Sequence, residues 1–279
     1  MSILHCGRFR LSLDRPLVMG IVNLTPDSFS SDGLCNDVER AVAHARHQLD
    51  AGADILDIGA ESSRPGAIPT PADEELRRLL PVLHRIADWG VPISVDTYKP
   101  AVMREAIAAG ASLFNDITGL RDPASMDLLR KSDCAVCIMH MQGEPGGMQQ
   151  APRYENVVAE VHDYLLGRTD ACLRAGVAKE RVILDPGFGF GKTLDHNLAL
   201  FRALTALGEA GYPLLVGVSR KTMLGTITGR AVDQRQSASV AAAMLAAQKG
   251  AKILRVHDVA ATRDALRVMA AIEQGVFCE

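Results

Sequence analysis

The chain repeats one pattern of hydrophobic and polar positions along most of its length. A short apolar run without alternation ends in a polar residue and is followed by a stretch with apolar residues at helical spacing. Strands covered on both faces, as parallel strands are, give such unbroken runs. The runs are residues 17–23, 53–58, 92–96, 112–115, 135–140, 182–185, 214–217 and 252–255.

The stretches between the runs carry helix signals. Residues 38–50, 74–89 and 101–109 have helical periodicity, and a glycine follows shortly after each. Parallel strands need such crossovers, and eight strands alternating with eight helices close most economically into a barrel. The pattern therefore predicts a (β/α)₈ barrel, an α/β fold in one domain over residues 1–279, with a short hairpin around residues 8–13 closing one end. A doubly wound open sheet is the alternative, but no G-x-G-x-x-G follows the first run.

One run is followed by an unusual turn. In residues 181–193, RVILDPGFGFGKT, Asp185 ends the run and three glycines follow, which let the backbone approach a ligand closely. Phe188 and Phe190 are unexpected in a polar turn, so we expect one to pack beneath the loop and the other to face a ligand. A phosphate-binding P-loop is disfavoured because Pro186 stands where its first glycine belongs.

Composition narrows the class of protein. The 279 residues are 48% hydrophobic but only 4% aromatic, and a net charge of −3 gives no basic excess for a nucleic-acid groove. No apolar run approaches the about 18 residues of a membrane helix, and residues 1–10 lack the layout of a signal peptide. We therefore expect a cytoplasmic protein with no nucleic-acid or membrane partner.

The cysteines predict free thiols. Six are scattered along the chain, mostly inside predicted elements, which fits a reducing compartment. Cys134 and Cys137 have the spacing of half a zinc site, but positions three apart in a strand point to opposite faces. With no second Cys or His pair at ligand spacing, a metal–thiolate site is not expected.

Polar residues end nearly every predicted strand. In a barrel these strand ends converge on one mouth, and burying polar groups unpaired costs roughly 2–7 kcal/mol each. A ligand is the simplest partner for such a set. Its members are Asn23, residues 57–64, Asp96, Asn115, His140, Asp185, residues 219–221 and residues 255–257.

The types of residue indicate two kinds of chemistry. Asp96, Asn115 and Asp185 offer several acceptors and one amide donor, which suits a flat, nitrogen-rich ring such as a pterin or a purine. Each carboxylate alone is equally well explained as a helix N-cap or a turn residue; it is the three at equivalent depth that favour a ligand.

The cations of the mouth suit a phosphate or diphosphate. We expect them to cluster on the side opposite the carboxylates; they are Arg64, Lys221, Arg255 and His257.

The first strand end carries oxygen ligands without a carboxylate pair. Asn23, Thr25, Asp27 and Ser28 favour a Mg²⁺ ion held mainly by phosphate and water.

Two connections are long for this fold. Residues 25–36 and 62–70 are rich in Ser, Pro and Gly, and we expect them to close over a substrate. For a third such loop, residues 143–152, disorder is the expectation.

Eight motifs in order resemble those of the dihydropteroate synthases and cover nearly the whole chain. They are MGIVNLTPDSFS (19–30), DILDIGAESSRPGA (54–67), ISVDTYKP (93–100), FNDITG (114–119), MHMQG (139–143), ILDPGFGFGK (183–192), GVSRK (217–221) and RVHDV (255–259). The resemblance implies a (β/α)₈ enzyme of folate synthesis. Such a transferase joins 6-hydroxymethyl-7,8-dihydropterin diphosphate to p-aminobenzoate and releases diphosphate and 7,8-dihydropteroate.

The resemblance also implies roles for individual residues. Asp96, Asn115, Asp185 and Lys221 would hold the pterin ring, and Arg255 would stack on it and bind diphosphate with His257. Four of these residues are expected to act in the reaction: Lys221, Arg255, Asp96 and Asp185.

Further roles come from the same likeness. Asn23 would help to ligate Mg²⁺, and Ser63 and Arg64 would close from the second loop. The p-aminobenzoate pocket would be lined by Phe29, Pro65, Phe190 and Thr222. The family likeness further suggests a homodimer formed through helices near the C-terminus.

The residues support a dissociative substitution. Diphosphate leaves readily once cations absorb its charge, and carboxylates can stabilise the developing pterin-methyl cation. No Ser-His-Asp or Cys-His arrangement is evident.

The chain departs from the family pattern at three positions. Ser63 and Thr222 replace Thr and Ser, each keeping a hydroxyl, and Ala60 replaces Gly. These changes bear on affinity for the aryl acid and for the sulfonamides that mimic it. Two alternatives stay open: a pterin-binding barrel that transfers methyl groups to a corrinoid protein, and an inactive pterin-binding paralogue.

Overall fold

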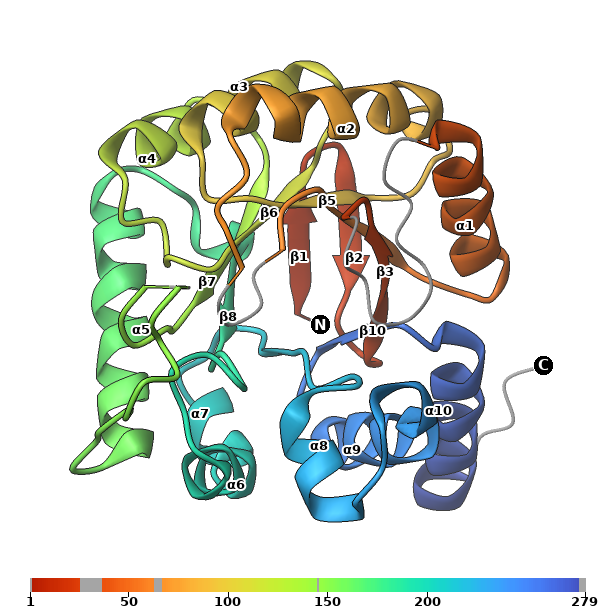
Figure 1. Cartoon of the computed structure of the whole chain (residues 1–279), viewed down its shortest axis with the longest axis vertical. Helices are drawn as coiled ribbons and strands as arrows, with labels where there is room; N and C mark the ends of the chain where they lie inside the picture. Colours follow the sequence, from red (N-terminus) through yellow and green to blue (C-terminus); the bar gives the residue numbers. More distant parts are fainter. Residues whose placement is uncertain (1, 26–36, 63–66, 145, 276–279) are drawn as a thin grey trace.

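Eight parallel strands form the centre of the molecule in a computed structural model that describes residues 2–25, 37–62, 67–144 and 146–275 (Figure 1). Their order is β8-β7-β6-β5-β4-β3-β10-β9, and a parallel bridge between Leu184 and Leu214 joins the two ends of this sheet. The predicted barrel is therefore confirmed. The strands are β3 (Leu17–Asn23), β4 (Ile55–Gly59), β5 (Ile93–Asp96), β6 (Leu113–Asp116), β7 (Ala135–Met139), β8 (Val182–Asp185), β9 (Leu215–Val216) and β10 (Ile253–Val256).

Helices surround the barrel, as Figure 1 shows. One helix follows each of the first five barrel strands, but two helices follow β8 and two follow β9, so a simple alternation of eight and eight is wrong for the described residues. The helices are α1 (Val38–Asp50), α2 (Ala72–Ile86), α3 (Pro100–Ala108), α4 (Pro123–Arg130), α5 (Val157–Arg174), α6 (Leu194–Arg202), α7 (Leu204–Gly208), α8 (Thr222–Thr228), α9 (Gln236–Gln248) and α10 (Val259–Gln274).

Local chemistry sets the helix ends. At the start of α1, the Asp37 side chain accepts a hydrogen bond from the Arg40 amide, and Gly52 follows the helix with φ of 99°. The second helix begins at Ala72, two residues earlier than predicted, because Pro71 precedes an acidic first turn that suits the positive end of the helix dipole.

The strands sort their side chains into two layers. Alternate residues such as Val18, Leu56 and Val136 point outward and pack on the helices in one large apolar cluster. The residues between them, such as Met19, Ile55 and Cys137, point inward and fill the lower part of the barrel. Both layers are buried, which explains why hydrophobicity along these strands shows no alternation.

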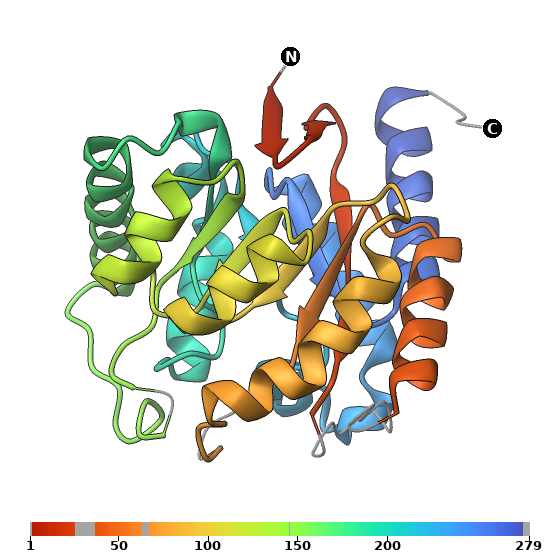
Figure 2. The ribbon, with the colours of Figure 1, turned by 90° about the horizontal axis from the view of Figure 1, so that it is seen from above.

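A hairpin covers the end of the barrel where the strands begin, at the top in Figure 2. It comprises β1 (Ile3–Cys6) and β2 (Phe9–Ser12), so the predicted hairpin is present and its first strand begins earlier than residue 8. Leu4 and Cys6 are buried in the inner cluster, and the Cys6 Sγ donates to the Ser112 carbonyl oxygen at 3.2 Å. This end is therefore closed by apolar packing.

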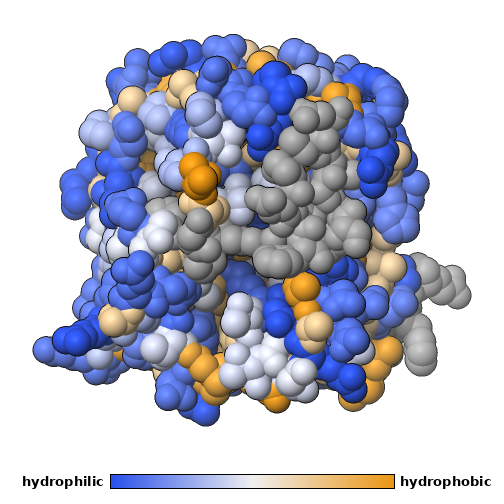
Figure 3. All heavy atoms as spheres, in the orientation of Figure 1, coloured by the Kyte–Doolittle hydropathy of each residue, from blue (hydrophilic) through white to orange (hydrophobic). Residues whose placement is uncertain are grey.

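The face seen in Figure 3 is mostly hydrophilic, with separate small hydrophobic areas. Among the described residues, no helix has both the length and the apolar character to cross a membrane.

Candidate active site

Polar and charged side chains form the upper layer of the barrel interior, where the apolar inner cluster stops. They occupy the inward positions of five different strands. Register places the two nearest members side by side, since Asp96 of β5 pairs with Asn115 of β6. The layer contains Asp57, Asp96, Asn115, Asp185 and Arg255, all buried or nearly so.

Arg255 lies between two carboxylates. Its Nε donates to Asp57 Oδ2 at 2.7 Å and its Nη2 to Asp96 Oδ2 at 2.8 Å. The expectation that the cations stand apart from the carboxylates is therefore wrong for Arg255. A buried guanidinium needs adjacent anions to offset its desolvation, so the two kinds of charge have to mix.

These charges shift each other's ionisation. Burial raises the pKa of Asp96 to about 7, with Arg255 opposing and Asp57 adding to the rise. Burial also raises the pKa of Asp185, against the charges of Lys221 and Arg255. For Arg255 burial alone would lower the pKa, but Asp57 and Asp96 raise it above its ordinary value. Perturbed carboxylates in a barrel mouth are typical of a functional site.

Lys221 stands beside this group at the start of α8. Its Nζ donates to the Phe188 carbonyl oxygen and lies 4.5 Å from the centroid of the Phe190 ring. Burial lowers the pKa of Lys221 to about 8, while the nearby Asp185 raises it. The described residues place no carboxylate within 4.0 Å of this ammonium. Lys221 is therefore available to an anionic or carbonyl-bearing ligand.

Within the part of the chain that the structure describes, three buried oxygen atoms of the barrel interior have no hydrogen-bond partner. They are Asp57 Oδ1, Ser94 Oγ and Asn115 Oδ1. Unpaired buried acceptors cost stability, and native proteins rarely keep them without a functional reason. Their position at one mouth indicates that N–H donors of a ligand complete them.

The end of β10 continues the site. The imidazole Nδ1 of His257 lies 3.0 Å from Ser219 Oγ, and the His257 amide donates to the same oxygen at 3.3 Å. Next to it, Arg220 Nη2 and Asp258 Oδ1 form an ion pair of 2.8 Å. Arg220 has φ of 58°, a conformation unfavourable for a non-glycine residue, directly before Lys221. The ion pair fixes this strained turn and hence the start of α8.

The glycine-rich turn after β8 behaves as predicted for its two phenylalanines. Phe188 is fully buried and packs against Phe201 with ring centroids 5.8 Å apart. Phe190 is half-buried and presents its ring to the Lys221 ammonium. Whether that ring also contacts a ligand stays a prediction.

His140 lies behind this turn. The strand β7 ends at Met139, whose side chain belongs with Ile117 and Met141, so His140 follows on the outward side. Its ring packs edge-on against Tyr164 at 5.0 Å and its Nδ1 accepts from Lys192 Nζ at 3.0 Å. The expectation that His140 belongs to the polar set facing the ligand is therefore wrong.

Asn23 supplies an amide oxygen at the end of β3, beside the carboxyl end of β4. Around it, the described residues contain no group of three or more His, Cys, Asp or Glu side chains that could bind a metal ion. An amide oxygen without a carboxylate cage suits Mg²⁺, which retains several waters and is held largely by substrate phosphates. The amide oxygen of Asn23 is thus of a type that fits the predicted ion, and its role as a metal ligand stays a prediction.

Several predicted residues lie outside the described residues. These are Asp27, Ser28, Phe29, Ser63, Arg64 and Pro65, which belong to the two long loops. Thr222 is the first residue of α8 and is exposed.

The cysteines agree with the prediction. Cys6, Cys134, Cys137 and Cys172 are free and buried. Cys134 packs in the outer cluster and Cys137 in the inner one, on opposite faces of the sheet. They cannot share a metal ion.

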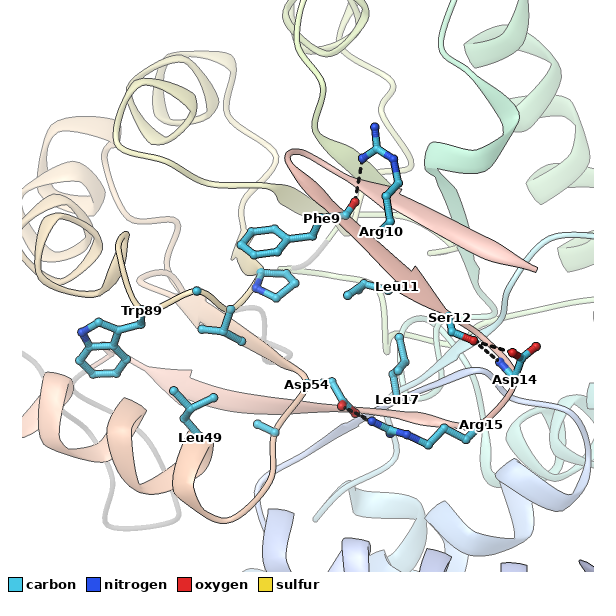
Figure 4. Close-up of a pocket in the computed structure, with 14 residues that line it drawn as sticks. Phe9, Arg10, Leu11, Ser12, Asp14, Arg15, Leu17, Leu49, Asp54 and Trp89 are labelled. Atoms are coloured by element: carbon cyan, nitrogen blue, oxygen red, sulfur yellow. Dashed lines mark hydrogen bonds and ion pairs between the residues drawn. The ribbon is translucent and has the colours of Figure 1, made fainter. Parts of the chain in front are cut away.

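A second hollow lies at the opposite end of the barrel (Figure 4). It has a volume of about 700 Å³ and is lined by the hairpin and by the segments before β3, β4 and β5. Its walls include Phe9, Leu17 and Trp89, and its charged edge is an ion pair of 2.7 Å between Arg15 and Asp54. Arg15 and Asp54 already pair with each other, and the described lining contains none of the unpaired buried acceptors of the mouth, so this hollow is not the candidate active site.

Comparison with known proteins decides the family. Residues 19–257 match the family described as pterin binding enzyme. A relative from Neisseria meningitidis serogroup C, named dihydropteroate synthase, is 51% identical over 273 residues, which cover 96% of each chain. The chain belongs to the dihydropteroate synthase family.

Solved structures of the family share its fold. Dihydropteroate synthase from Xanthomonas albilineans with 4-aminobenzoic acid has a TM-score of 0.91 and 51% identity, covering 98% of both chains. The same enzyme in complex with 7,8-dihydropteroate has a TM-score of 0.87 and 47% identity, covering 98% of this chain and 99% of that one. The dihydropteroate synthase barrel, including its N-terminal hairpin, is therefore the fold of this chain.

Sequence reasoning placed Asp57 at the mouth but gave it no role, and it overlooked Lys192 beneath the glycine turn. A role for Asp57 could have been predicted, because residues 57 and 59 are two positions apart in one strand and therefore point to the same, inward face. Lys192 follows the glycines directly, yet nothing in its sequence context distinguishes a buried lysine from an exposed one.

Proposed function

We propose that this dihydropteroate synthase condenses 6-hydroxymethyl-7,8-dihydropterin diphosphate with p-aminobenzoate to give 7,8-dihydropteroate and diphosphate. The observation that carries this proposal is the convergence of Asp96, Asp185, Lys221 and Arg255 on one mouth, where each shifts the ionisation of its neighbours. The names of the relatives support the same reaction.

The pterin ring would bind against the carboxylate and amide side of this layer. Asn115 Oδ1 and Asp57 Oδ1 have no hydrogen-bond partner among the described residues, so they can accept N–H bonds from the ring without breaking the contacts described. Asp96 and Asp185 add acceptors, and the Lys221 ammonium can donate to a ring carbonyl or nitrogen. Asp185 is held for this by the Gly187 amide, which donates to its Oδ1 at 2.7 Å.

The reaction proceeds by dissociative substitution. The bond between the pterin methylene carbon and the diphosphate oxygen breaks, and the diphosphate leaves with the electron pair. Arg255 and His257 stabilise its negative charge, while Asp96 and Asp185 stabilise the pterin-methyl cation. The amine nitrogen of p-aminobenzoate then forms the new C–N bond and loses a proton. The surrounding side chains only need to hold charges, and no covalent enzyme intermediate is involved.

Asn23 would hold the Mg²⁺ ion, with further ligands from the diphosphate oxygens and water. When bound, the ion supplies positive charge that neutralises the leaving diphosphate.

The aryl amine would enter beside Phe190 and Thr222. Phe190 offers an aromatic face and Thr222 a hydroxyl at the N-terminus of α8. Phe29 and Pro65 keep their predicted role in lining this pocket, and Ser63 and Arg64 keep theirs in closing from the second loop.

An assay of diphosphate release tests the proposal. Purified protein with Mg²⁺ should release diphosphate only when both the pterin diphosphate and p-aminobenzoate are present, with one dihydropteroate formed per diphosphate. Pterin binding without release would instead identify an inactive paralogue, and methyl transfer from methyltetrahydrofolate would identify the corrinoid-dependent class.

We also infer a homodimer built on the last helices. Large apolar side chains are exposed there: Ile227 of α8 at 55%, Leu245 of α9 at 47%, and Val268 and Ile272 of α10 at 57% and 79%. A second copy is the occupant that the family resemblance favours. Light scattering after size exclusion should give twice the chain mass, and Val268→Glu should give the monomer.

The protein is proposed to work in the cytoplasm. Its four described cysteines are free, which suits a reducing compartment. Fractionation of the native host, with the protein detected by antibody, tests this placement.

A further inference from the structure

Lys192 is the most deeply buried amine among the described lysines, with 4% of its surface exposed. It follows the glycine turn of residues 186–191 directly, and its side chain folds back beneath that turn. The described residues place no carboxylate within ion-pair distance of its Nζ, and burial lowers the pKa of Lys192 to about 7, against the charge of Asp185. A buried ammonium without an anion is costly, so its remaining contacts must account for it.

Those contacts are made with the turn and with the strand beside it. Lys192 Nζ donates to the Gly187 carbonyl oxygen at 2.9 Å, to the Phe190 carbonyl oxygen at 3.0 Å and to His140 Nδ1 at 3.0 Å, and the His140 carbonyl oxygen lies 3.4 Å away. An ammonium has three N–H donors, and these four acceptors leave none of them without a partner. His140 must be neutral to accept, and burial together with the Lys192 charge lowers its pKa to about 3. The lysine therefore ties the turn after β8 to the end of β7.

The turn is built to lie close against β7. Gly187 has φ of 70°, and a Cβ there would stand 1.9 Å from the His140 carbonyl oxygen. A Cβ on Gly191, with φ of 60°, would stand 2.6 Å from the Gln142 carbonyl oxygen. Glycine permits this approach but does not hold it, because it has no side chain to bind with. Side chains of neighbouring elements hold the turn: Asn197 accepts from the Gly189 amide, Tyr154 donates to the Gly191 carbonyl oxygen, and Lys192 adds its attachment from below.

The upper side of the same turn faces the active site. The Phe188 carbonyl oxygen accepts from Lys221, and the Phe190 ring lies against the Lys221 ammonium. Lys192 therefore binds the backbone carbonyl of the same residue, Phe190, whose ring contacts Lys221. A shift of the turn by about 1 Å is enough to change catalysis substantially.

We propose that Lys192 is a positioning residue that fixes the glycine turn, and with it the Phe190 face, for the aryl amine substrate. This inference rests on the proposed function for its substrate. The pterin side depends less on Lys192, because Asp96, Asn115 and Arg255 belong to other strands, Asp185 lies on β8 before the turn, and Lys221 lies at the start of α8.

Lys192→Met tests the proposal, since it keeps the length of the side chain and removes all three donors. The KM for p-aminobenzoate should rise about 10- to 100-fold, while the Kd for the pterin diphosphate changes less than about threefold. Lys192→Gln retains an N–H donor, so its KM for p-aminobenzoate should lie between that of Lys192→Met and that of the wild type. Lys131→Met, at the exposed lysine that follows α4, is the matched control and should leave both constants unchanged.

A second readout does not need turnover. Hydrogen exchange at the amides of Gly187, Gly189 and Phe190 should be at least about tenfold faster in Lys192→Met, with the helices α1 and α10 unchanged. Lack of diphosphate release by the wild type would overturn the proposed function and leave this exchange test in force. Unchanged exchange, equal losses for both substrates, or failure of both Lys192 variants to fold would overturn the positioning role.

Discussion

The two ends of the barrel use charged residues in opposite ways. At the end covered by the hairpin, Asp54 accepts from Arg15, from Arg263 and from the Val18 amide, so its oxygens are fully used within the protein. At the other end, one carboxylate oxygen of Asp57 pairs with Arg255, and the other has no hydrogen-bond partner among the described residues. The amide oxygen of Asn115 has no partner there either. Among the described residues, the acceptors of the first end are satisfied within the protein, and two of the second end are not.

This difference separates stability from function along one axis. Apolar residues and closed ion pairs fix the lower barrel, which allows the upper layer to keep unpaired acceptors and lysines of lowered pKa. Such a layer costs folding energy, and a marginally stable protein retains it only when it serves binding or catalysis. The following predictions test this division, beginning with the largest expected effect on activity.

Two arginine substitutions compare the ends most strongly. Arg255→Ala should lower kcat/KM by about 10²- to 10³-fold, because it removes the cation that stabilises the leaving group. It should also destabilise the fold by about 3–5 kcal/mol, since Asp57 and Asp96 are left buried without their partner. Steady-state kinetics and urea unfolding measure the two effects.

Arg263→Ala is the matched control at the other end. It removes one ion pair of Asp54 but leaves Arg15 in place, so we expect a loss of about 1–3 kcal/mol in unfolding free energy. Its kcat/KM should stay within about twofold of the wild type. A large loss of kcat/KM in this variant would show that the hairpin end also serves activity and would contradict this division of roles.

Asn115→Leu should separate stability from binding. The amide oxygen of Asn115 has no partner in the ligand-free protein, so an apolar side chain of similar size should leave the melting temperature unchanged or raise it. Affinity for the pterin should fall about 10- to 100-fold, because a ring N–H loses its acceptor. Thermal melts and calorimetric titration provide the measurements. A lower melting temperature would mean that the acceptor is satisfied within the protein.

The pH dependence of the reaction should report Lys221. Its pKa is lowered to about 8 by burial, so kcat/KM should fall about tenfold for each pH unit above that value as the ammonium loses its proton. Lys221→Arg should abolish this fall of kcat/KM at high pH, because a guanidinium remains protonated throughout. If kcat/KM of this variant still falls at the same pH, the fall belongs to another group.

The same shift has a defined sign for stability. The folded-state pKa of Lys221 lies below the unfolded value of about 10.4, so the unfolded chain binds more protons between the two values. The contribution of Lys221 to stability should therefore increase as pH rises from about 8 toward 10.4. Urea unfolding of wild type and Lys221→Arg across this range measures the difference.

Leu4→Ala should have the smallest effect on activity. The side chain is buried in the inner cluster with 1% exposure, so its truncation should cost about 2–5 kcal/mol of stability. Because it lies at the hairpin end, kcat/KM of the folded protein should be unchanged. Kinetics below the melting transition, compared with the wild type at the same temperature, check this expectation.

The barrel could be predicted from the sequence because its strands are unbroken apolar runs that end in polar residues. β3 and β8 have the predicted bounds, and Asp96, Asn115 and Asp185 lie on the predicted layer. The alternation of side chains along a strand makes this prediction possible, because polar residues at inward positions near the carboxyl end must either face a ligand or pair with another side chain of the protein.

Pairing across the barrel could not be predicted. A strand end shows that Arg255 points inward, but the partners Asp57 and Asp96 are 198 and 159 residues away. His140 was misplaced because the run was extended by one residue beyond Met139, and a shift of one residue moves a side chain to the other face.

Binding of the pterin with and without its diphosphate tests the central claim most directly, namely that the charged mouth holds a diphosphate-bearing pterin. Calorimetric titration of 6-hydroxymethyl-7,8-dihydropterin and of its diphosphate into wild type and Arg255→Ala gives four dissociation constants. The substitution should weaken binding of the diphosphate at least about tenfold more than binding of the alcohol. Equal losses for the two ligands would show that Arg255 serves the ring alone and would contradict the account.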